Sequence, residues 1–365
     1  MASISAQLFC RENVSLNDRI IEESLKKPFI TVVVPVRNEE RYIESTLRQL
    51  LSQDYPMDRF EIIVVDGDSD DMTTMLARRE ASQHADAAVH VYDNPRRLSS
   101  SGRNVGVRAA KGDYILIVDG HVFIPSRRLL TDMALAVVLN GARVIGRPQR
   151  LRPPNISDFQ AIVAEVRASR IGHSNESHIY SEATGFVSPI SVAVMYERTL
   201  FDEVGMFNEG FDAAEDLEFN YRLERAGHQC FICPKFEVYY YPRETLGQLF
   251  KQMRRYGEGR ANFYATYPRR FTLNAVIPAA FVLTTTILVI LSTAFRPALI
   301  ALVVLLTAYV AIVLVANLSV FRQQKKSLHL IIPIALVIHF GLGWGMLRGF
   351  LLRAVGALRR RPALG

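Results

Sequence analysis

The segment YILIVDGHVF, residues 114–123, combines an apolar run with two polar groups. The β-branched and aromatic residues at its start predict a buried strand. Asp119 and His121 follow this run and are separated by Gly120, so both side chains can point toward one site if the backbone turns at the glycine. A carboxylate oxygen and an imidazole nitrogen together suit Mn²⁺ or a similar divalent ion. Alone, the pattern is weak and favours solvated or structural residues.

Other apolar runs alternate with helical patterns along the first part of the chain. Buried strands are also predicted within residues 29–40, 60–71 and 87–94, and helices within 41–53, 72–83 and 99–112. Such alternation is typical of an α/β domain with a mostly parallel sheet. Ligands of these sheets bind outside the carboxyl ends of the strands. Asp66, Asp68, Asp119 and His121 all lie at predicted strand ends.

The first strand excludes the usual dinucleotide site. That site opens with a glycine-rich turn, which lets the backbone approach a pyrophosphate. Here the strand ends PVRNEE, residues 35–40, without a glycine. A bound diphosphate must therefore be held in another way, and a divalent metal is the natural candidate.

The charge of the chain is unevenly distributed. The net charge of the 365 residues is +7, but residues 259–365 carry 12 of the 43 Lys and Arg and no Asp or Glu. Residues 1–258 are therefore acidic, with 31 basic against 36 acidic side chains. Because the basic residues of the tail alternate with long apolar runs, we expect an anionic membrane surface rather than nucleic acid as their partner.

Three runs in the tail are long enough for membrane-spanning helices, which need about 20 apolar residues. The candidate spans are 272–295, 297–320 and 328–347. Buried core helices are the alternative. The basic residues within 321–326 predict a cytoplasmic loop and a cytoplasmic N-terminal domain. The third run is then open to three interpretations: a full span, a re-entrant segment, or an interfacial helix over 341–361.

The N-terminal residues lack the apolar core of a signal peptide, which agrees with a cytoplasmic first domain. Cys230 and Cys233 in CFIC have no second Cys or His pair to complete a zinc site, and their surroundings predict a strand. We therefore expect an N-terminal extension over 1–28, a catalytic domain over 29–258, and a basic interfacial and transmembrane region over 259–365.

An ordered set of motifs resembles glycosyltransferase family 2. The set is VVVPVRNEE, VVDGDSDD, RNVG, VDGH, EDLEFNYRLERAG (215–227) and QMRRY (252–256). The DGH form, followed by Pro125, looks most like the succinoglycan-biosynthesis branch. The resemblance implies a GT-A fold and an inverting sugar transfer from a nucleoside-diphosphate sugar. It also implies Mn²⁺ or Mg²⁺ on Asp119, with His121 replacing the commoner aspartate as the second ligand.

The resemblance assigns further residues to donor binding. The segment from Pro35 to Glu39 would line the nucleoside, while the diphosphate or donor sugar would lie against Arg103 and Asn104, which we expect at the start of the short helix that follows a turn within 99–112. The donor-binding set is Pro35, Arg37, Asn38, Glu39, Asp66, Asp68, Arg103, Asn104, Asp119, Gln252, Arg255 and Tyr256. Asp66 would contact the base or the ribose. Arg255 would pair with the departing diphosphate, and Tyr256, which replaces the family's Trp, would stack on the acceptor sugar.

Asp216 corresponds to the base of the family's E-D motif. An inverting transfer needs one base to take the proton of the acceptor hydroxyl. The helix that begins with Glu215 and Asp216 would keep the carboxylate ionised, because a helix N-terminus favours negative charge. Two acids that only favour the helix dipole are the structural alternative.

The sequence thus predicts a multi-pass glycosyltransferase of the cell inner membrane with a cytoplasmic catalytic domain. Its partners would be a nucleoside-diphosphate sugar, such as a UDP-hexose, a lipid-linked saccharide acceptor in exopolysaccharide or cell-surface glycan synthesis, the membrane, and other glycan-assembly proteins. Alternatives are a polyprenyl-phosphate sugar transferase, a processive polysaccharide synthase and, outside catalysis, an inactive membrane scaffold.

Overall fold

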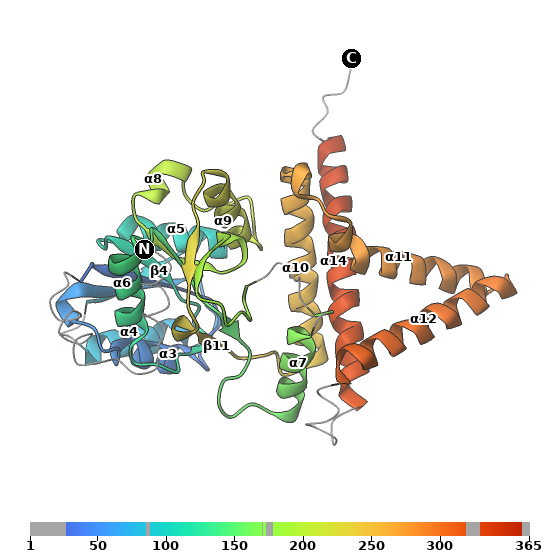
Figure 1. Ribbon diagram of the computed structural model, residues 1–365, viewed down its shortest axis with the longest axis horizontal. Helices are drawn as coiled ribbons and strands as arrows, with labels where there is room; N and C mark the ends of the chain where they lie inside the picture. The colour runs from blue at the N-terminus through green and yellow to red at the C-terminus, as the bar shows by residue number, and fades with distance from the viewer. Residues whose placement is uncertain (1–26, 85–87, 170, 173–177, 319–328, 360–365) are drawn as a thin grey trace, which may run out of the picture. The chain divides into compact units, whose positions relative to one another are not determined.

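The computed structural model describes residues 27–84, 88–169, 171–172, 178–318 and 329–359 (Figure 1). The chain forms two compact units. The first, called the sheet unit, comprises Met1–Pro154 and Glu176–Tyr241, and the second, called the helical unit, comprises Asn155–Asn175 and Pro242–Gly365. The predicted N-terminal extension lies almost entirely outside the described residues.

The sheet unit alternates strands and helices as predicted. Its elements are β1 (Ile30–Val36), α3 (Ile43–Leu51), β2 (Phe60–Asp66), α4 (Thr73–Gln83), β3 (Val89–Asp93), α5 (Ser99–Ala109), β4 (Tyr114–Ile117), β5 (Val122–Phe123), α6 (Leu129–Asn140), β6 (Val144–Gly146), β7 (Gln149–Arg150), β8 (Gly185–Val187), β9 (Ala193–Glu197), α8 (Leu200–Val204), α9 (Glu215–Arg225), β10 (Cys230–Ile232) and β11 (Val238–Tyr240).

In the described part of the chain, the main sheet has eight strands in the order β3-β2-β1-β4-β9-β6-β10-β8. Strands β1 to β4 pair in parallel, with Val36 opposite Asp66 at their carboxyl ends, whereas β9 is antiparallel to both β4 and β6. The predicted α/β class with a mostly parallel sheet is therefore confirmed. The crossover helices place the carboxyl ends of β1, β2 and β4 along one edge.

Each face of the main sheet has its own hydrophobic core. Val32, Val34 and Ile62 face α3 and α6, whereas Val33 and Ile63 face α5, α8 and α9. All five side chains are fully buried, which is why the central strands are apolar without alternation.

A second sheet among the described residues has three strands in the order β5-β11-β7. The strand predicted in the segment 114–123 is in fact two strands, because the chain leaves the main sheet after Ile117 and pairs again at Val122. In the small sheet β11 is antiparallel to β5 and parallel to β7. Residues 118–121 therefore run between two sheets, close to the end of β11.

The described residues of the helical unit form five α-helices. These are α7 (Asp158–Ala168), α10 (Leu246–Thr266), α11 (Leu273–Ser292), α12 (Arg296–Ala316) and α14 (Ile331–Arg359). Helices α10 and α14 approach closely through glycines: a Cβ on Gly345 would lie 2.0 Å from the Arg254 carbonyl oxygen, and one on Gly257 would lie 2.2 Å from that of Leu342. Close backbone approach at small residues is typical of helix pairs in membranes.

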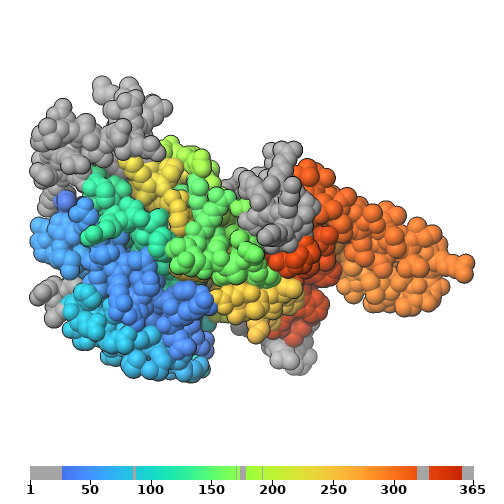
Figure 2. All heavy atoms as spheres, turned by 90° about the horizontal axis from the view of Figure 1, so that it is seen from below, coloured from blue at the N-terminus to red at the C-terminus, as the bar shows by residue number. Residues whose placement is uncertain are grey.

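Three of these helices are long and apolar enough to cross a membrane, over Leu273–Ser292, Arg296–Ala316 and Ile331–Val355. This confirms three apolar C-terminal helices near the predicted spans. Many outward side chains of α11 and α12, orange in Figure 2, are exposed, with Ile290 at 63% and Ile300 at 64%. The third run is one continuous helix. The domain boundaries predicted from the sequence remain predictions, and α10 runs unbroken across residue 258.

Candidate active site

The link between β4 and β5 carries Asp119, Gly120 and His121. Its backbone is held by Thr46 of α3, whose hydroxyl donates to the Gly120 carbonyl at 2.9 Å. A Cβ on Gly120 would lie 2.6 Å from Cγ1 of Val36, at the end of β1. Only glycine fits such a close approach, so the tight packing of this link explains the residue between the two polar side chains.

His121 is paired with Glu39. Its Nδ1 lies 2.8 Å from Oε1 of Glu39, which is in the link between β1 and α3. When the ring is neutral, a proton on Nδ1 shared with this carboxylate leaves the lone pair on Nε2, a tautomer that we assign from the contact. The pair resembles the carboxylate–histidine arrangement that orients metal-binding histidines. Glu39, predicted to line the nucleoside, thus makes its contact with His121.

Asp119 lies among positive charges and donors. Burial alone would raise the pKa of its carboxyl, but Arg103, His121 and Arg147, together with a hydrogen bond from the Tyr240 hydroxyl, hold that pKa below its ordinary value. The side chain is nevertheless 32% exposed. Asp119 is therefore ionised at neutral pH and reachable by a ligand.

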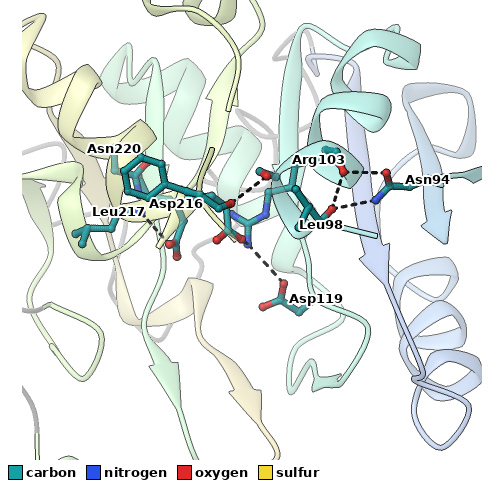
Figure 3. A network of polar contacts seen from close by, with 12 residues as sticks. Asn94, Leu98, Arg103, Asp119, Asp216, Leu217 and Asn220 are labelled. Carbon is teal, nitrogen blue, oxygen red and sulfur yellow. Dashed lines mark hydrogen bonds and ion pairs between the residues drawn. The ribbon is translucent and has the colours of Figure 1, made fainter. Parts of the chain in front are cut away.

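Arg103 bridges the Asp119 link and helix α9 (Figure 3). Its Nη2 lies 3.3 Å from Oε1 of Glu215 and 3.9 Å from Oδ1 of Asp119, and its guanidinium carbon lies 5.4 Å from the ring centre of Phe207. Burial would lower the pKa of Arg103, but Glu215, Asp216 and Asp119 raise it. A buried, permanent positive charge therefore joins the two acidic segments.

The position predicted for Arg103 and Asn104 at a helix start is wrong. Helix α5 begins at Ser99, so both residues lie in its second turn, because the serine run of 99–101 already adopts helical geometry. Their amide groups consequently do not form an anion-binding terminus. Asn104 is 2% exposed, and its side chain exchanges hydrogen bonds with the backbone of Phe207 and donates to Glu209. It holds the chain segment after α8 in place.

The carboxyl ends of β1 and β2 are bound together. The buried Asp66 accepts hydrogen bonds from the backbone and hydroxyl of Ser69 at 3.1 and 2.6 Å, and Asn38 accepts one from the Asp70 backbone at 2.9 Å. Asn38 and Asp68 both have a φ of +57°, in the left-handed region that Asn and Asp tolerate best.

The other predicted donor-binding residues at this edge differ in exposure. Pro35 is half-buried and Arg37 is exposed. Asp68 pairs with Arg97, which donates from Nε at 2.7 Å. Asp66, Asn38 and Asp68 thus all lie at the edge where parallel sheets bind ligands.

The two carboxylates at the start of helix α9 lie in different environments. Glu215 is 6% exposed and faces Arg103, and burial raises its pKa although Arg103 opposes the rise. Asp216 is exposed, with Oδ1 accepting from the Leu217 backbone at 2.8 Å. The helix ends at Arg225, and Gly227, which follows, has a φ of +88°, in the left-handed region typical of a helix end. Adjacent carboxylates therefore have different chemistry: one is a buried ion-pair partner and the other is solvent-accessible.

Gln252, Arg255 and Tyr256 lie on α10, in the helical unit. Nε2 of Gln252 donates to the Tyr256 hydroxyl at 3.3 Å, and Tyr256 is 41% exposed. These three predicted donor residues therefore belong to a different compact unit from Asp119 and Asp216. Their predicted roles remain predictions.

Sequence reasoning missed Arg147 and Tyr240. Arg147 follows β6 and is 1% exposed, and its Nη2 donates to the Tyr240 hydroxyl at 2.9 Å. The available signals were an arginine directly after an apolar strand, in VIGRP, and the tyrosine run of residues 239–241. Neither signal indicates that β11 pairs beside β5, which is what brings both residues to Asp119.

Within the described residues, no group of three or more His, Cys, Asp or Glu side chains could hold a metal ion. A cation at Asp119 and His121 would therefore need further ligands from a substrate or water, as is common where a metal binds together with substrate phosphates.

The arrangement of strands and helices in the sheet unit is that of the GT-A fold. The structure of a mannosyltransferase from Pyrobaculum calidifontis, in complex with GDP-Man and Mn²⁺, superposes with a TM-score of 0.57 and 21% identity, covering 92% of this chain and 95% of that one. The family profile described as "Glycosyltransferase like family 2" matches residues 27–259. The chain belongs to this family.

Two curated relatives agree with this assignment. The chain is 31% identical over 254 residues to the succinoglycan biosynthesis protein ExoA of Rhizobium meliloti (strain 1021), covering 68% of this chain and 74% of that protein. This confirms the resemblance to the succinoglycan branch. The second relative is a dolichyl N-acetyl-alpha-D-glucosaminyl phosphate 3-beta-D-2,3-diacetamido-2,3-dideoxy-beta-D-glucuronosyltransferase of Methanococcus voltae. The two chains are 24% identical over 335 residues, which cover 88% of this chain and 97% of that protein.

Proposed function

We propose that this glycosyltransferase is an inverting, metal-dependent enzyme that moves a sugar from a nucleoside diphosphate to a lipid-linked saccharide. The observation that carries the proposal is the meeting of Asp119 with Arg103 and helix α9 at the carboxyl edge of the parallel sheet. This edge offers an accessible, ionised carboxylate for a metal–diphosphate group and a second accessible carboxylate, Asp216, on the adjoining helix.

The residues present fit a divalent cation. Asp119 supplies an ionised carboxylate, and His121 supplies a ring nitrogen whose partner nitrogen is oriented by Glu39. One oxygen and one nitrogen ligand suit Mn²⁺, and Mg²⁺ is the second candidate. When bound, such an ion would neutralise charge on the donor's diphosphate and on the departing nucleotide. The mannosyltransferase of similar fold, in complex with Mn²⁺ and GDP-Man, supports this assignment.

The nucleoside would lie over the ends of β1 and β2, against the segment from Pro35 to Glu39. Each carboxylate oxygen of Asp66 accepts one hydrogen bond from Ser69 and retains a lone pair for a base N–H or a ribose hydroxyl. A UDP-hexose is the donor that we expect, and GDP-sugars are the alternative.

Asp216 is the base of the proposed reaction. It takes the proton of the acceptor hydroxyl as the oxygen attacks the anomeric carbon from the face opposite the diphosphate, which inverts the configuration. Its exposure allows contact with an incoming acceptor, whereas Glu215 is buried against Arg103.

A lipid-linked acceptor would explain the helical unit. The three apolar helices and the basic tail suit the inner face of an anionic plasma membrane, with the sheet unit in the cytoplasm. Arg255 and Tyr256 on α10 would then contact the departing diphosphate and the acceptor sugar. The names of the two relatives, one in succinoglycan biosynthesis and one acting on a dolichyl-linked sugar phosphate, support such an acceptor.

The Methanococcus relative also keeps the main alternative open. An acceptor that is a polyprenyl phosphate itself would require the same donor site and base. A processive synthase would release a long polymer. A scaffold would neither transfer sugar nor hydrolyse the donor.

A donor screen tests the proposal. UDP- and GDP-sugars are incubated with the full-length protein and a membrane lipid extract, with Mn²⁺ or with EDTA, and product is followed by radiolabel and mass spectrometry. We expect transfer of a single sugar to a lipid-linked saccharide, loss of transfer in EDTA with recovery on adding Mn²⁺, and no transfer by Asp119→Ala. Full activity in excess EDTA would refute the metal assignment. Transfer to free polyprenyl phosphate alone would establish the alternative acceptor.

A further inference from the structure

Arg147 is a buried positive charge that interacts with Asp119 but has an incomplete set of hydrogen bonds. The residue is 1% exposed, and its Nη2 donates to the Tyr240 hydroxyl at 2.9 Å. Among the described residues, its Nε and Nη1 find no hydrogen-bond partner. A buried guanidinium with two unpaired nitrogens is costly, and an apolar side chain of similar size is often as stable or more stable in such a place. Stability therefore does not explain this arginine.

The contacts of Tyr240 indicate what the arginine does. Because the tyrosine oxygen accepts a hydrogen bond from Arg147, its proton is directed away from the arginine, and the acidic neighbour that interacts with this hydroxyl is Asp119. The ring of Tyr240 meets the His121 ring edge-on, with centroids 5.9 Å apart and planes at 82°. One tyrosine thus contacts both side chains to which we assign the metal.

We propose that Arg147 and Tyr240 are positioning residues that hold the Asp119 carboxylate and the His121 ring in the orientation that binds a divalent cation. This inference rests on the proposed function. Carboxylates and imidazoles that bind metals depend on such outer hydrogen bonds, whose removal typically weakens metal affinity by about 10- to 100-fold. Arg147 acts through Tyr240, because it fixes the direction in which the hydroxyl donates.

The neighbouring strand residue provides a matched control. Tyr239 precedes Tyr240 on β11 and projects to the opposite face of the small sheet, where its hydroxyl donates to Glu237 at 2.9 Å and its ring stacks on Phe123. Tyr239→Phe and Tyr240→Phe each remove one hydroxyl from the same strand and keep the ring. Only the second removes a contact to Asp119.

The test is Mn²⁺ affinity, measured by electron paramagnetic resonance on the full-length protein in detergent, with UDP and separately with GDP present. We expect Tyr240→Phe to weaken Mn²⁺ binding by about 10- to 100-fold and Tyr239→Phe to leave it unchanged. Arg147→Met should weaken binding in the same direction while its thermal midpoint stays equal or rises, since it removes a buried charge.

Two outcomes would overturn the inference in distinguishable ways. If Asp119→Ala lost Mn²⁺ but Tyr240→Phe bound it like the wild type, the positioning role would be wrong and the metal assignment would stand. If Asp119→Ala bound Mn²⁺ as tightly as the wild type, the metal assignment itself would fail, and the positioning role with it.

Discussion

Asp216 and Glu215 are adjacent carboxylates for which the structure predicts opposite defects. Asp216→Asn keeps the size of the side chain and an oxygen that can accept from the Leu217 backbone, but it abolishes proton acceptance. Glu215→Gln leaves the proposed base intact and removes the partner that lies 3.3 Å from the buried Arg103. The first change should therefore impair the chemical step and the second the folded state.

The expected losses of rate and of stability follow from where each side chain lies. Loss of a general base typically costs about 10²- to 10⁴-fold in rate, which corresponds to about 2.7–5.4 kcal/mol of transition-state stabilisation. As an exposed residue, Asp216 should change the free energy of unfolding by less than about 0.5 kcal/mol.

Breaking a buried ion pair costs about 3–5 kcal/mol when the remaining charge is left alone. Here Asp119 stays 3.9 Å from Arg103, and burial already disfavours the ionised form of Glu215. We therefore expect Glu215→Gln to lower the free energy of unfolding by a smaller amount, about 1–3 kcal/mol.

Three measurements separate the variants: single-turnover transfer rates, nucleotide affinity by isothermal titration, and thermal unfolding. Asp216→Asn should show a lower kcat with donor affinity and thermal midpoint near those of the wild type. Glu215→Gln should show a lower midpoint and a smaller loss of kcat. The reasoning is refuted if Asp216→Asn transfers sugar normally or mainly loses nucleotide binding. A stable Glu215→Gln with the larger loss of kcat would make Glu215 the base.

Gly120→Ala should weaken Mn²⁺ and nucleotide binding and destabilise the fold by about 1–3 kcal/mol, because the added Cβ would lie 2.6 Å from Cγ1 of Val36. Titration calorimetry measures the binding and thermal unfolding the stability, and binding equal to that of the wild type would contradict the prediction. A chain that ends at Thr272 should aggregate on size-exclusion chromatography, because it lacks α14 and exposes the apolar faces of α7 and α10; a monodisperse product would contradict this. A hydrogen bond from His228 lowers the pKa of Glu203, so this group stabilises the fold above its ordinary pKa and ceases to do so as the pH falls through its lowered value. The advantage of the wild type over Glu203→Gln in thermal midpoint should thus shrink on acidification, and a difference independent of pH would be evidence against this pairing.

Much of the fold could be predicted from local patterns. The runs that became β1, β2 and β4 are apolar without alternation because both of their faces are buried, and such runs indicate a parallel sheet wherever they occur. The same pattern put Asp66 and Asp119 near strand ends. The three charge-free runs near the C-terminus likewise identified long apolar helices, since length and composition are sufficient for that inference.

The boundaries of helices, and the compact unit to which a helix belongs, were harder to predict from the sequence. The start of α5 was placed too late because Ser99, Ser100 and Ser101 are weak helix formers, whereas buried contacts such as that of the Ser100 hydroxyl with the Phe211 carbonyl hold them in the helix. Helix α7 lies within the stretch assigned to the catalytic domain, yet it packs on α14, because its apolar face is complementary to a helix more than 160 residues later.

The electrostatics of the candidate site depended on tertiary structure altogether. Glu39 meets His121 across 82 residues, Arg147 meets Tyr240 across 93, and Arg103 reaches Glu215 from another helix. No local spacing encodes such pairs, because each depends on which strands are neighbours and on which face of a helix is buried. The sequence could therefore predict which residues carry the chemistry, whereas only the packed sheets and helices decided which of them are ionised, accessible or held in place.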